Sequence, residues 1–379
     1  MTKLKRRLMI FVLTVVGLAL VLFTAACLIL NSPSFGALPE GERLERVKAS
    51  PNYRNGSFQN LDPATSNRMQ NLSLGDKLKI LWRFVFARPK DIRPQDSIPV
   101  ERHDLSLLDK SENLIVWFGH SGYLLQVDGV RYLVDPVFES GAPLGIGNSF
   151  FKGTKVYHAE DMPDIDYLII SHDHWDHLDY DVVKALQPRV KKAYMGLGVG
   201  AHFEQWGYRP EQIVELDWNE SAPLTEGGHI HCLPTQHFSG RGLTSGQSLW
   251  ASFLVEGREH SVYIGGDGGF GKHYEAIGKR FPNIDLAILE NGQYNERWSD
   301  IHMLPKYTAA TMRALGAKRF LTVHHAKFAL AMHPWKEPLE HAKRLRDEEG
   351  FPILMPRIGH ITHYLDSTLT RDDWWEGLK

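Results

Sequence analysis

The segment from residue 166 to residue 180 constrains this chain of 379 residues more than any other part of its sequence. Residues 167–170 are apolar, which is typical of a short buried strand. They are followed within a few positions by four potential metal ligands: His172, His174, Asp176 and His177. Imidazole and carboxylate groups suit zinc, iron or manganese, whereas unliganded histidines packed this closely would repel one another when protonated. In a loop, the first two ligands can converge on one ion while the last two turn toward a second ion.

Three later apolar strands are each followed by a potential ligand: residues 230–233 by His237, residues 261–264 by Asp267, and residues 319–323 by His324 and His325. Asp267 lies within the glycine-rich segment 265–269, where the backbone can approach an ion closely. Asp267 is therefore the natural carboxylate to bridge two metals, and the alternative is a glycine-rich turn with a solvated aspartate. The repetition of strand and ligand predicts one site with two metal ions.

The N-terminus has the pattern of a membrane anchor. Basic residues at positions 3, 5, 6 and 7 precede an uncharged apolar run from Leu8 to Leu30. A run of about 20 residues can cross a bilayer as a helix. Positive charge before the run favours an N-terminus in the cytoplasm, which puts the rest of the chain outside it, on the periplasmic or extracellular side of the inner membrane if the source is a bacterium. The alternatives are a signal peptide cleaved near residues 24–26, a lipoprotein signal ending at Cys27, and a buried core helix.

These features predict three parts: residues 1–30 as a transmembrane helix or signal anchor, residues 31–98 as a linker and wrapping segment, and residues 99–379 as a hydrolase domain. Prolines, glycines and polar residues in 31–75 predict a tether or irregular wrapping rather than core. Residues 76–88 have the pattern of a basic amphipathic helix, which could rest on lipid headgroups or pack on the domain.

The order of predicted elements favours a mixed α/β fold. Strands at 114–118, 123–127 and 130–134 form an opening meander, and strand–loop–helix units follow. His120 and Asp135 lie in turns beside these strands, either as groups that orient the ligands or simply as turn residues. The formal charge of −2 gives no bulk attraction to nucleic acid, so we expect no nucleic-acid partner.

The same motifs resemble the metallo-β-lactamase superfamily. From about residue 115 to about residue 338 they resemble, more specifically, the N-acylphosphatidylethanolamine-hydrolysing phospholipase D family and its bacterial relatives. The phrases that carry this resemblance include residues 117–120, 134–136, 170–180, 214–218, 294–298 and 328–331. The resemblance implies a four-layer αβ/βα sandwich with two zinc ions at its edge, and it suggests a homodimer. Iron or manganese could replace zinc on such ligands.

The resemblance also assigns a role to each candidate residue. One zinc would be held by His172, His174 and His237, the other by Asp176, His177 and His324, with Asp267 as the bridge. The implied catalytic residues are Asp176, Asp267 and His302, and the implied substrate-binding residues are His120, Tyr294 and His302.

The function that follows is a membrane-anchored, metal-dependent hydrolase. We expect a phosphodiesterase of the phospholipase D type that acts on phospholipids or N-acyl phospholipids through a hydroxide held between two zinc ions. The alternative is a lactonase or another small-molecule ester or phosphoester hydrolase, because the same hydroxide can attack a carbonyl carbon. A non-enzymatic metal-binding protein fits less well, because a decayed site would be expected to lack at least one ligand.

Overall fold

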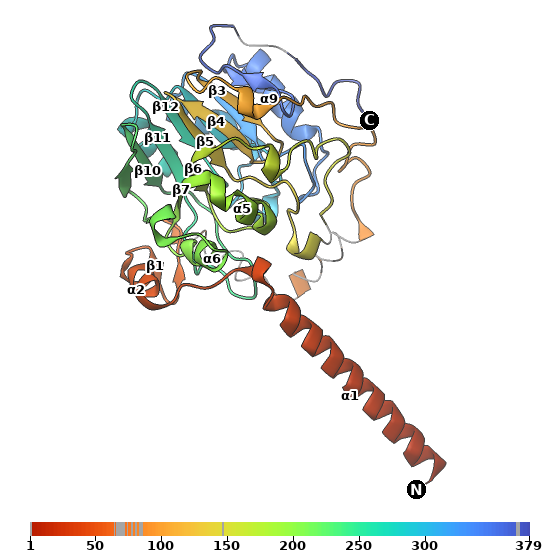
Figure 1. Cartoon of the computed structure of the whole chain (residues 1–379). Coiled ribbons are helices and arrows are strands. Elements are labelled where there is room, and N and C mark those ends of the chain that lie inside the picture. Colours follow the sequence, from red (N-terminus) through yellow and green to blue (C-terminus); the bar gives the residue numbers. More distant parts are fainter. Residues whose placement is uncertain are drawn as a thin grey trace.

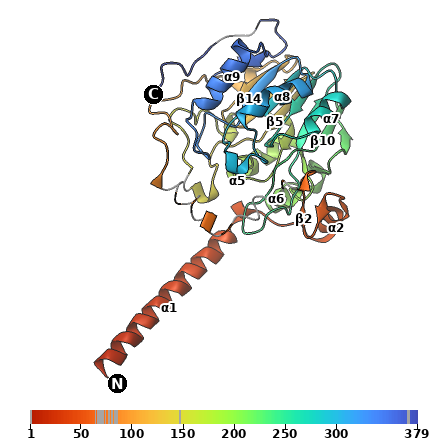
Figure 2. The same cartoon turned by 180° about the vertical axis from the view of Figure 1, so that it is seen from behind.

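The structure is a computed structural model, and it describes residues 2–63, 65, 73, 75–76, 79, 82, 86–145, 148–368 and 372–379. The basic amphipathic helix predicted over residues 76–88 lies largely outside the described residues. Figures 1 and 2 show a layered domain from which one long helix projects.

Two seven-stranded mixed sheets form the centre of the domain. The first has the order β16 (Ile361–Thr362), β3 (Leu114–Trp117), β4 (Tyr123–Val127), β5 (Val130–Val134), β6 (Ile165–Ile170), β7 (Val190–Gly196) and β8 (Ile213–Leu216). The second has the order β15 (Ile353–Leu354), β14 (Phe320–Val323), β13 (Leu286–Glu290), β12 (Ser261–Ile264), β11 (Ser252–Glu256), β10 (His229–Leu233) and β9 (Ser221–Pro223). Each sheet is antiparallel at one end and parallel at the other.

Strand β6 illustrates why the central strands are apolar along their whole length. All of its residues are buried. Tyr167 and Ile169 pack in the core shared with the second sheet, whereas Leu168 and Ile170 pack in the core beneath the helices. Successive strand residues face opposite sides of a sheet, so a strand covered on both faces has no polar side.

Helices cover the outer face of each sheet, which gives the four layers that the sequence predicts. Helices α5 (Tyr180–Leu186) and α6 (Gly200–Gln205) lie on the first sheet, and α7 (His273–Arg280), α8 (Pro305–Leu315) and α9 (Glu337–Asp347) lie on the second. Asp179 caps α5 as expected, because its carboxylate accepts hydrogen bonds from the backbone N–H groups of Asp181 and Val182. The four-layer αβ/βα sandwich is thus confirmed.

Some predicted boundaries differ from the structure. The strand expected from Ser248 begins only at Ser252, because the residues before it bond outside the sheet. Ser248 donates to Asp173, and the Trp250 indole donates to Asn60. The short edge strands β9, β15 and β16 escaped prediction, since two or three residues carry too little periodicity to be recognised.

The projecting helix is α1 (Lys3–Leu30), and none of its residues is buried. Its length of 28 residues, and a mean hydropathy of 2.8 over its most apolar 18 residues, are sufficient to cross a membrane. Its exposure excludes the buried core helix that the sequence left as an alternative. The helix is a candidate membrane anchor or signal sequence.

The segment after α1, predicted as a tether or irregular wrapping outside the core, contains regular elements, and two of its residues belong to the core. It forms helix α2 (Gly41–Ala49) and a hairpin of β1 (Tyr53–Arg54) and β2 (Ser57–Phe58). Val47 and Phe58 are buried in the main core. Two isolated apolar residues among polar ones give no periodic signal, so their burial was not predicted.

We expect Phe58→Ala to lower the free energy of unfolding by about 3–5 kcal/mol, the usual cost of truncating a buried phenylalanine. Leu61→Ala is the matched control, because Leu61 lies three residues away and is 53% exposed. Its effect should stay within about 0.5 kcal/mol. Urea unfolding of the full chain in detergent, followed by tryptophan fluorescence, measures both. Equal, small effects would mean that the segment is a tether after all.

Candidate metal centre

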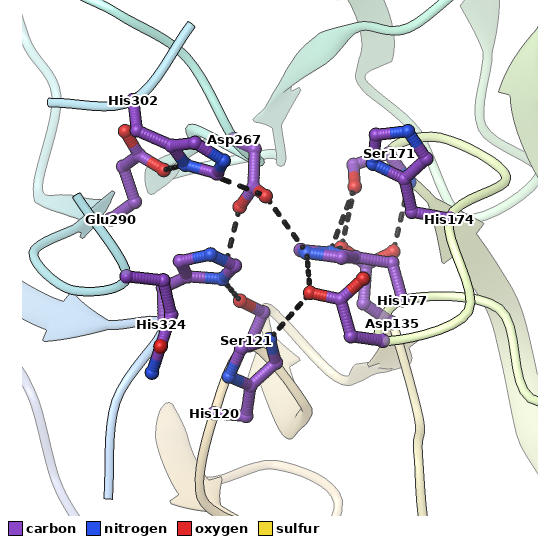
Figure 3. Close-up of polar contacts among 12 residues, drawn as sticks. His120, Ser121, Asp135, Ser171, His174, His177, Asp267, Glu290, His302 and His324 are labelled. Carbon is purple, nitrogen blue, oxygen red and sulfur yellow. Dashed lines mark hydrogen bonds and ion pairs between the residues drawn. The ribbon is translucent and has the colours of Figure 1, made fainter. Parts of the chain in front are cut away.

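The predicted ligands meet at the edge of the sandwich where strands of both sheets end. His172 follows β6, His237 follows β10, Asp267 follows β12 and His324 follows β14. The structure brings six of the seven candidate ligands into two neighbouring groups, and Asp267 lies close to His172 and His177, one from each group. Figure 3 shows the part of this cluster around Asp267.

The first group consists of His172, His174 and His237. The Nδ1 atom of His174 lies 2.8 Å from His172 Nε2 and 3.1 Å from His237 Nε2. Three nitrogens this close cannot all carry protons that point inward. They can all face one cation.

The second group consists of Asp176, His177 and His324, with His120 beside them. Asp176 Oδ2 lies 3.5 Å from His177 Nε2 and 3.0 Å from His120 Nε2. The ligand atoms of this group all lie within 4.8 Å of one another, which is the spacing expected of donors around one ion.

Asp267 stands between the two groups. Its Oδ2 atom lies 3.1 Å from His177 Nε2, 3.9 Å from His172 Nε2 and 3.8 Å from His237 Nε2. Its Oδ1 atom lies 3.1 Å from His324 Nδ1. One carboxylate therefore reaches donors of both groups, the position that a bridging ligand needs.

The backbone around Asp267 requires glycine. Gly266 has a φ angle of +61°, and a Cβ atom there would lie 2.9 Å from Ser171 Cβ. A side chain at position 266 would thus push Asp267 away from the loop of residues 171–179, which joins β6 to α5 and is called the metal loop below. Three non-glycine residues at this edge also have positive φ angles: His120, Asp135 and His324. Such strain persists where the surrounding structure enforces it, and it is common at functional sites.

The ring nitrogens that point away from the cluster are held by other groups. Asp135 accepts from the Ser171 backbone N–H and lies 2.8 Å from His177 Nδ1. His237 Nδ1 lies 2.9 Å from the carbonyl oxygen of Ile301. These contacts fix the rings so that their second nitrogens face the centre. Asp135 thus lies where an orienting group would lie.

The structure places the three predicted substrate-binding residues differently from one another. His302 lies beside Asp267, with His302 Nδ1 4.0 Å from Asp267 Oδ2. His120 is fully buried against Asp176, so it can orient that ligand but has no exposed surface to offer a substrate. The Tyr294 hydroxyl donates to Glu337 and its ring stacks on His333, so Tyr294 is not brought to the cluster.

Glu290 is a site residue that sequence reasoning missed. Its carboxylate accepts from the Met303 backbone N–H and lies 2.8 Å from His302 Nδ1 (Figure 3). Burial raises the pKa of Glu290, and the neighbouring His302 opposes this rise. Burial alone would lower the pKa of His302, but the Glu290 carboxylate outweighs it and raises that pKa. The only signal in the sequence is an acidic residue at the end of an apolar strand.

The electrostatics of the cluster fit cations. Burial lowers the pKa values of His172, His237 and His324 well below the usual value, so these imidazoles are neutral and keep a lone pair for a metal. Burial would raise the pKa of Asp267, but His177 and His324 hold it well below the usual value. Burial would lower the pKa of His177, but Asp267 and Asp176 raise it well above the usual value. A buried carboxylate here needs positive charge beside it, which a protonated His177 or a bound cation can supply.

Several buried polar atoms at the centre also lack a hydrogen-bond partner among the described residues. They include His177 Nε2, His324 Nε2 and Asp267 Oδ1. Leaving such an atom unsatisfied costs about 1–3 kcal/mol. Ligation of a cation would offset this cost, so the donor set fits metal ions.

Comparison with known proteins agrees with this geometry. Residues 130–325 match the family described as the beta-lactamase superfamily domain. An uncharacterised protein of Mycobacterium bovis is 38% identical over 86% of this chain and 87% of that protein. N-acyl-phosphatidylethanolamine-hydrolyzing phospholipase D 1 of Caenorhabditis elegans is 31% identical over 68% of this chain and 77% of that protein. A metallo hydrolase of the archaeon Ignicoccus hospitalis has a similar fold, with a TM-score of 0.51 and 18% identity over 66% of this chain and 97% of that one.

The neighbouring histidines 324 and 325 provide a test of the second group. His324 faces Asp267, whereas His325 packs its ring against Trp117 and lies 3.1 Å from the Thr322 carbonyl oxygen. We expect His324→Asn to lower the bound metal by about one ion per chain, and His325→Asn to leave the metal content unchanged. Elemental analysis by mass spectrometry measures both. Equal metal loss in the two variants would contradict the arrangement.

Gly266→Ala should lower metal content and stability together, because the added Cβ meets Ser171. Gly56→Ala is the matched control: Gly56 also has a positive φ angle, of +82°, but nothing lies within 4 Å of the added Cβ. We expect both variants to lose about 1 kcal/mol from backbone strain and only Gly266→Ala to lose metal. Metal retained in Gly266→Ala would show that this close approach does not position Asp267.

Proposed function

The chain belongs to the beta-lactamase superfamily, and we propose that it is a membrane-anchored phosphodiesterase of the phospholipase D type. A relative from Pyrobaculum aerophilum is named as a metal-dependent hydrolase. Its substrates would be phospholipids, N-acylated ones among them. We propose two zinc ions as its cofactors, with iron or manganese as the alternatives that imidazole and carboxylate ligands accept. Residues 99–379 would contain the hydrolase domain, and residues 1–30 would be the anchor.

The observation that carries this proposal is the position of Asp267 between two groups of donors. When bound, a pair of divalent ions lowers the pKa of coordinated water toward neutrality and offsets negative charge on a phosphate. A site of this kind needs no serine, cysteine or lysine nucleophile. It suits a phosphodiester, whose charge grows on the way to the transition state.

The side chains of the site have separate roles in this proposal. Asp267 would hold both ions at a fixed separation, and Asp176 would be held in place by His120. His302 would bind the substrate phosphate through Nε2, because its other ring nitrogen faces Glu290. The His302 side chain is 14% exposed, which leaves this edge accessible from outside.

Two observations support a lipid as the substrate. The nematode relative that covers most of this chain is named as a phospholipase D for N-acylated phosphatidylethanolamine. In addition, α1 has the length and hydropathy of a membrane anchor, so the enzyme would meet its substrate in the plane of a bilayer.

The decisive experiment incubates the metal-loaded full chain with a total lipid extract and identifies the products by mass spectrometry. We expect phosphatidic acid together with the released head group, and none of either from Asp176→Asn. Hydrolysis of lactones with every phospholipid left intact would favour the alternative hydrolase instead.

We expect Glu290→Gln to lower kcat by about 10- to 100-fold, because the carboxylate that orients His302 is lost while the shape is kept. KM should change much less, and metal content should stay at the wild-type level. Glu337→Gln is the control, because Glu337 pairs with Tyr294 away from the cluster. Steady-state kinetics on a soluble phosphodiester separates the two. A Glu290→Gln variant with unchanged kcat would remove Glu290 from the mechanism.

A further inference from the structure

We propose that the loop of residues 238–247 contacts the surface of the bilayer that α1 crosses, so that the metal centre opens toward that membrane. This proposal depends on the proposed function in two respects: α1 is a membrane anchor, and the substrate is a lipid. The occupant of this surface is the lipid headgroup layer around the end of α1.

The end of α1 lies beside the 238–247 loop. Leu30 is the last residue of α1, and it lines a cavity of about 230 Å³ together with Leu38 and Leu243. Figures 1 and 2 both show α1 leaving the domain at the end where α2 and α6 lie. If α1 spans a bilayer, the residues around Leu30 lie at the level of the lipid headgroups.

The connection from α1 to the domain is short and docked. Phe35 is only five residues beyond Leu30, which limits their separation to about 18 Å even in a fully extended chain. Its ring packs edge-on against Trp175 of the metal loop, with 4.9 Å between the ring centroids. The Pro33 carbonyl oxygen accepts a 2.7 Å hydrogen bond from the Trp206 indole. The metal loop therefore cannot lie far from the bilayer surface.

Arg241 joins the helix exit, the 238–247 loop and the metal loop. Its guanidinium donates to the carbonyl oxygens of Ser34, Asp173 and Leu178, and it lies 3.9 Å from the centre of the Trp175 ring. The Arg241 side chain is buried, so these contacts form a fixed unit rather than a surface ion pair.

The Asp173 carboxylate completes this unit. It accepts hydrogen bonds from the Gly240 backbone N–H, at 2.6 Å, and from the Ser248 hydroxyl, at 2.7 Å. Asp173 lies between the candidate ligands His172 and His174. The orientation of the loop is thus tied to both the metal loop and the anchor.

The outer surface of this unit carries exposed apolar side chains. Leu243 is 87% exposed, Leu38 is 53% exposed and Phe238 is 36% exposed. Phe238 directly follows His237, and its ring centroid lies 4.4 Å from that of His174. Exposed apolar side chains thus extend from the helix exit to the first group of candidate ligands. A surface of this kind beside a membrane anchor suits contact with lipid.

The first test places an environment-sensitive fluorophore on the loop. The full chain, in a Cys27→Ala background where Cys232 is buried, carries either Leu243→Cys or Leu107→Cys and is reconstituted into phosphatidylcholine vesicles through α1. Leu107 is the matched control, because it is 81% exposed and lies in the separate turn Leu105–Leu107. We expect a blue-shifted emission and quenching by a lipid-borne quencher at position 243 only. Emission typical of water at both positions would overturn the proposal.

The second test links this contact to the substrate. Leu243→Asp should lower hydrolysis of vesicle phospholipid about tenfold, because a charge replaces an inserted leucine. Leu107→Asp should change nothing, and both variants should hydrolyse a soluble phosphodiester at the wild-type rate. Unchanged vesicle hydrolysis by Leu243→Asp would overturn access from the membrane. If the protein hydrolyses no phospholipid at all, the proposed substrate fails, while the fluorophore measurement still decides the contact.

Discussion

The ionised carboxylate of Asp267 is the feature on which the rest of this site depends. A charge buried at the edge of two packed sheets is costly unless opposite charge lies beside it. Here His177, whose pKa Asp267 and Asp176 raise against the effect of burial, lies 3.1 Å from it, and several polar atoms at the centre have no hydrogen-bond partner among the described residues. The close approach at Gly266 and the positive φ angle of His324 are the backbone features that bring these groups together. The protein thus maintains a costly arrangement that bound cations would stabilise.

The fold makes that arrangement possible because strands from both sheets end at one edge. Strand β6 supplies the metal loop from the first sheet, and β10, β12 and β14 supply donors from the second. Each donor sits just beyond a buried strand, so its position is set by the core rather than by a flexible loop. The groups behind the donors, such as Asp135 and the Ile301 carbonyl, then fix the orientation of the rings.

The candidate ligands could be found from the sequence because each follows an apolar strand, and that pattern is local. The order of strands and helices predicted a mixed α/β fold, whereas the four layers were implied by the family resemblance. Glu290 could not be identified as a site residue, because in the sequence it is only the last residue of a strand. Its role depends on contact with His302, which lies twelve positions later in the chain. Tyr294 is the opposite case. Its motif matched the family and suggested contact with the substrate, but its hydroxyl donates to Glu337 away from the cluster. The role of Phe58 in the core was missed because a single apolar residue has no period.

The contacts at the end of α1 bear on how the N-terminal helix should be understood. Just after α1, Pro33, Ser34 and Phe35 contact Trp206, Arg241 and Trp175. If α1 is a membrane anchor, as proposed above, these contacts would hold the domain at a set depth and orientation above the membrane. In that arrangement the distance between the metal loop and the lipid surface is a property of the fold rather than of a flexible tether.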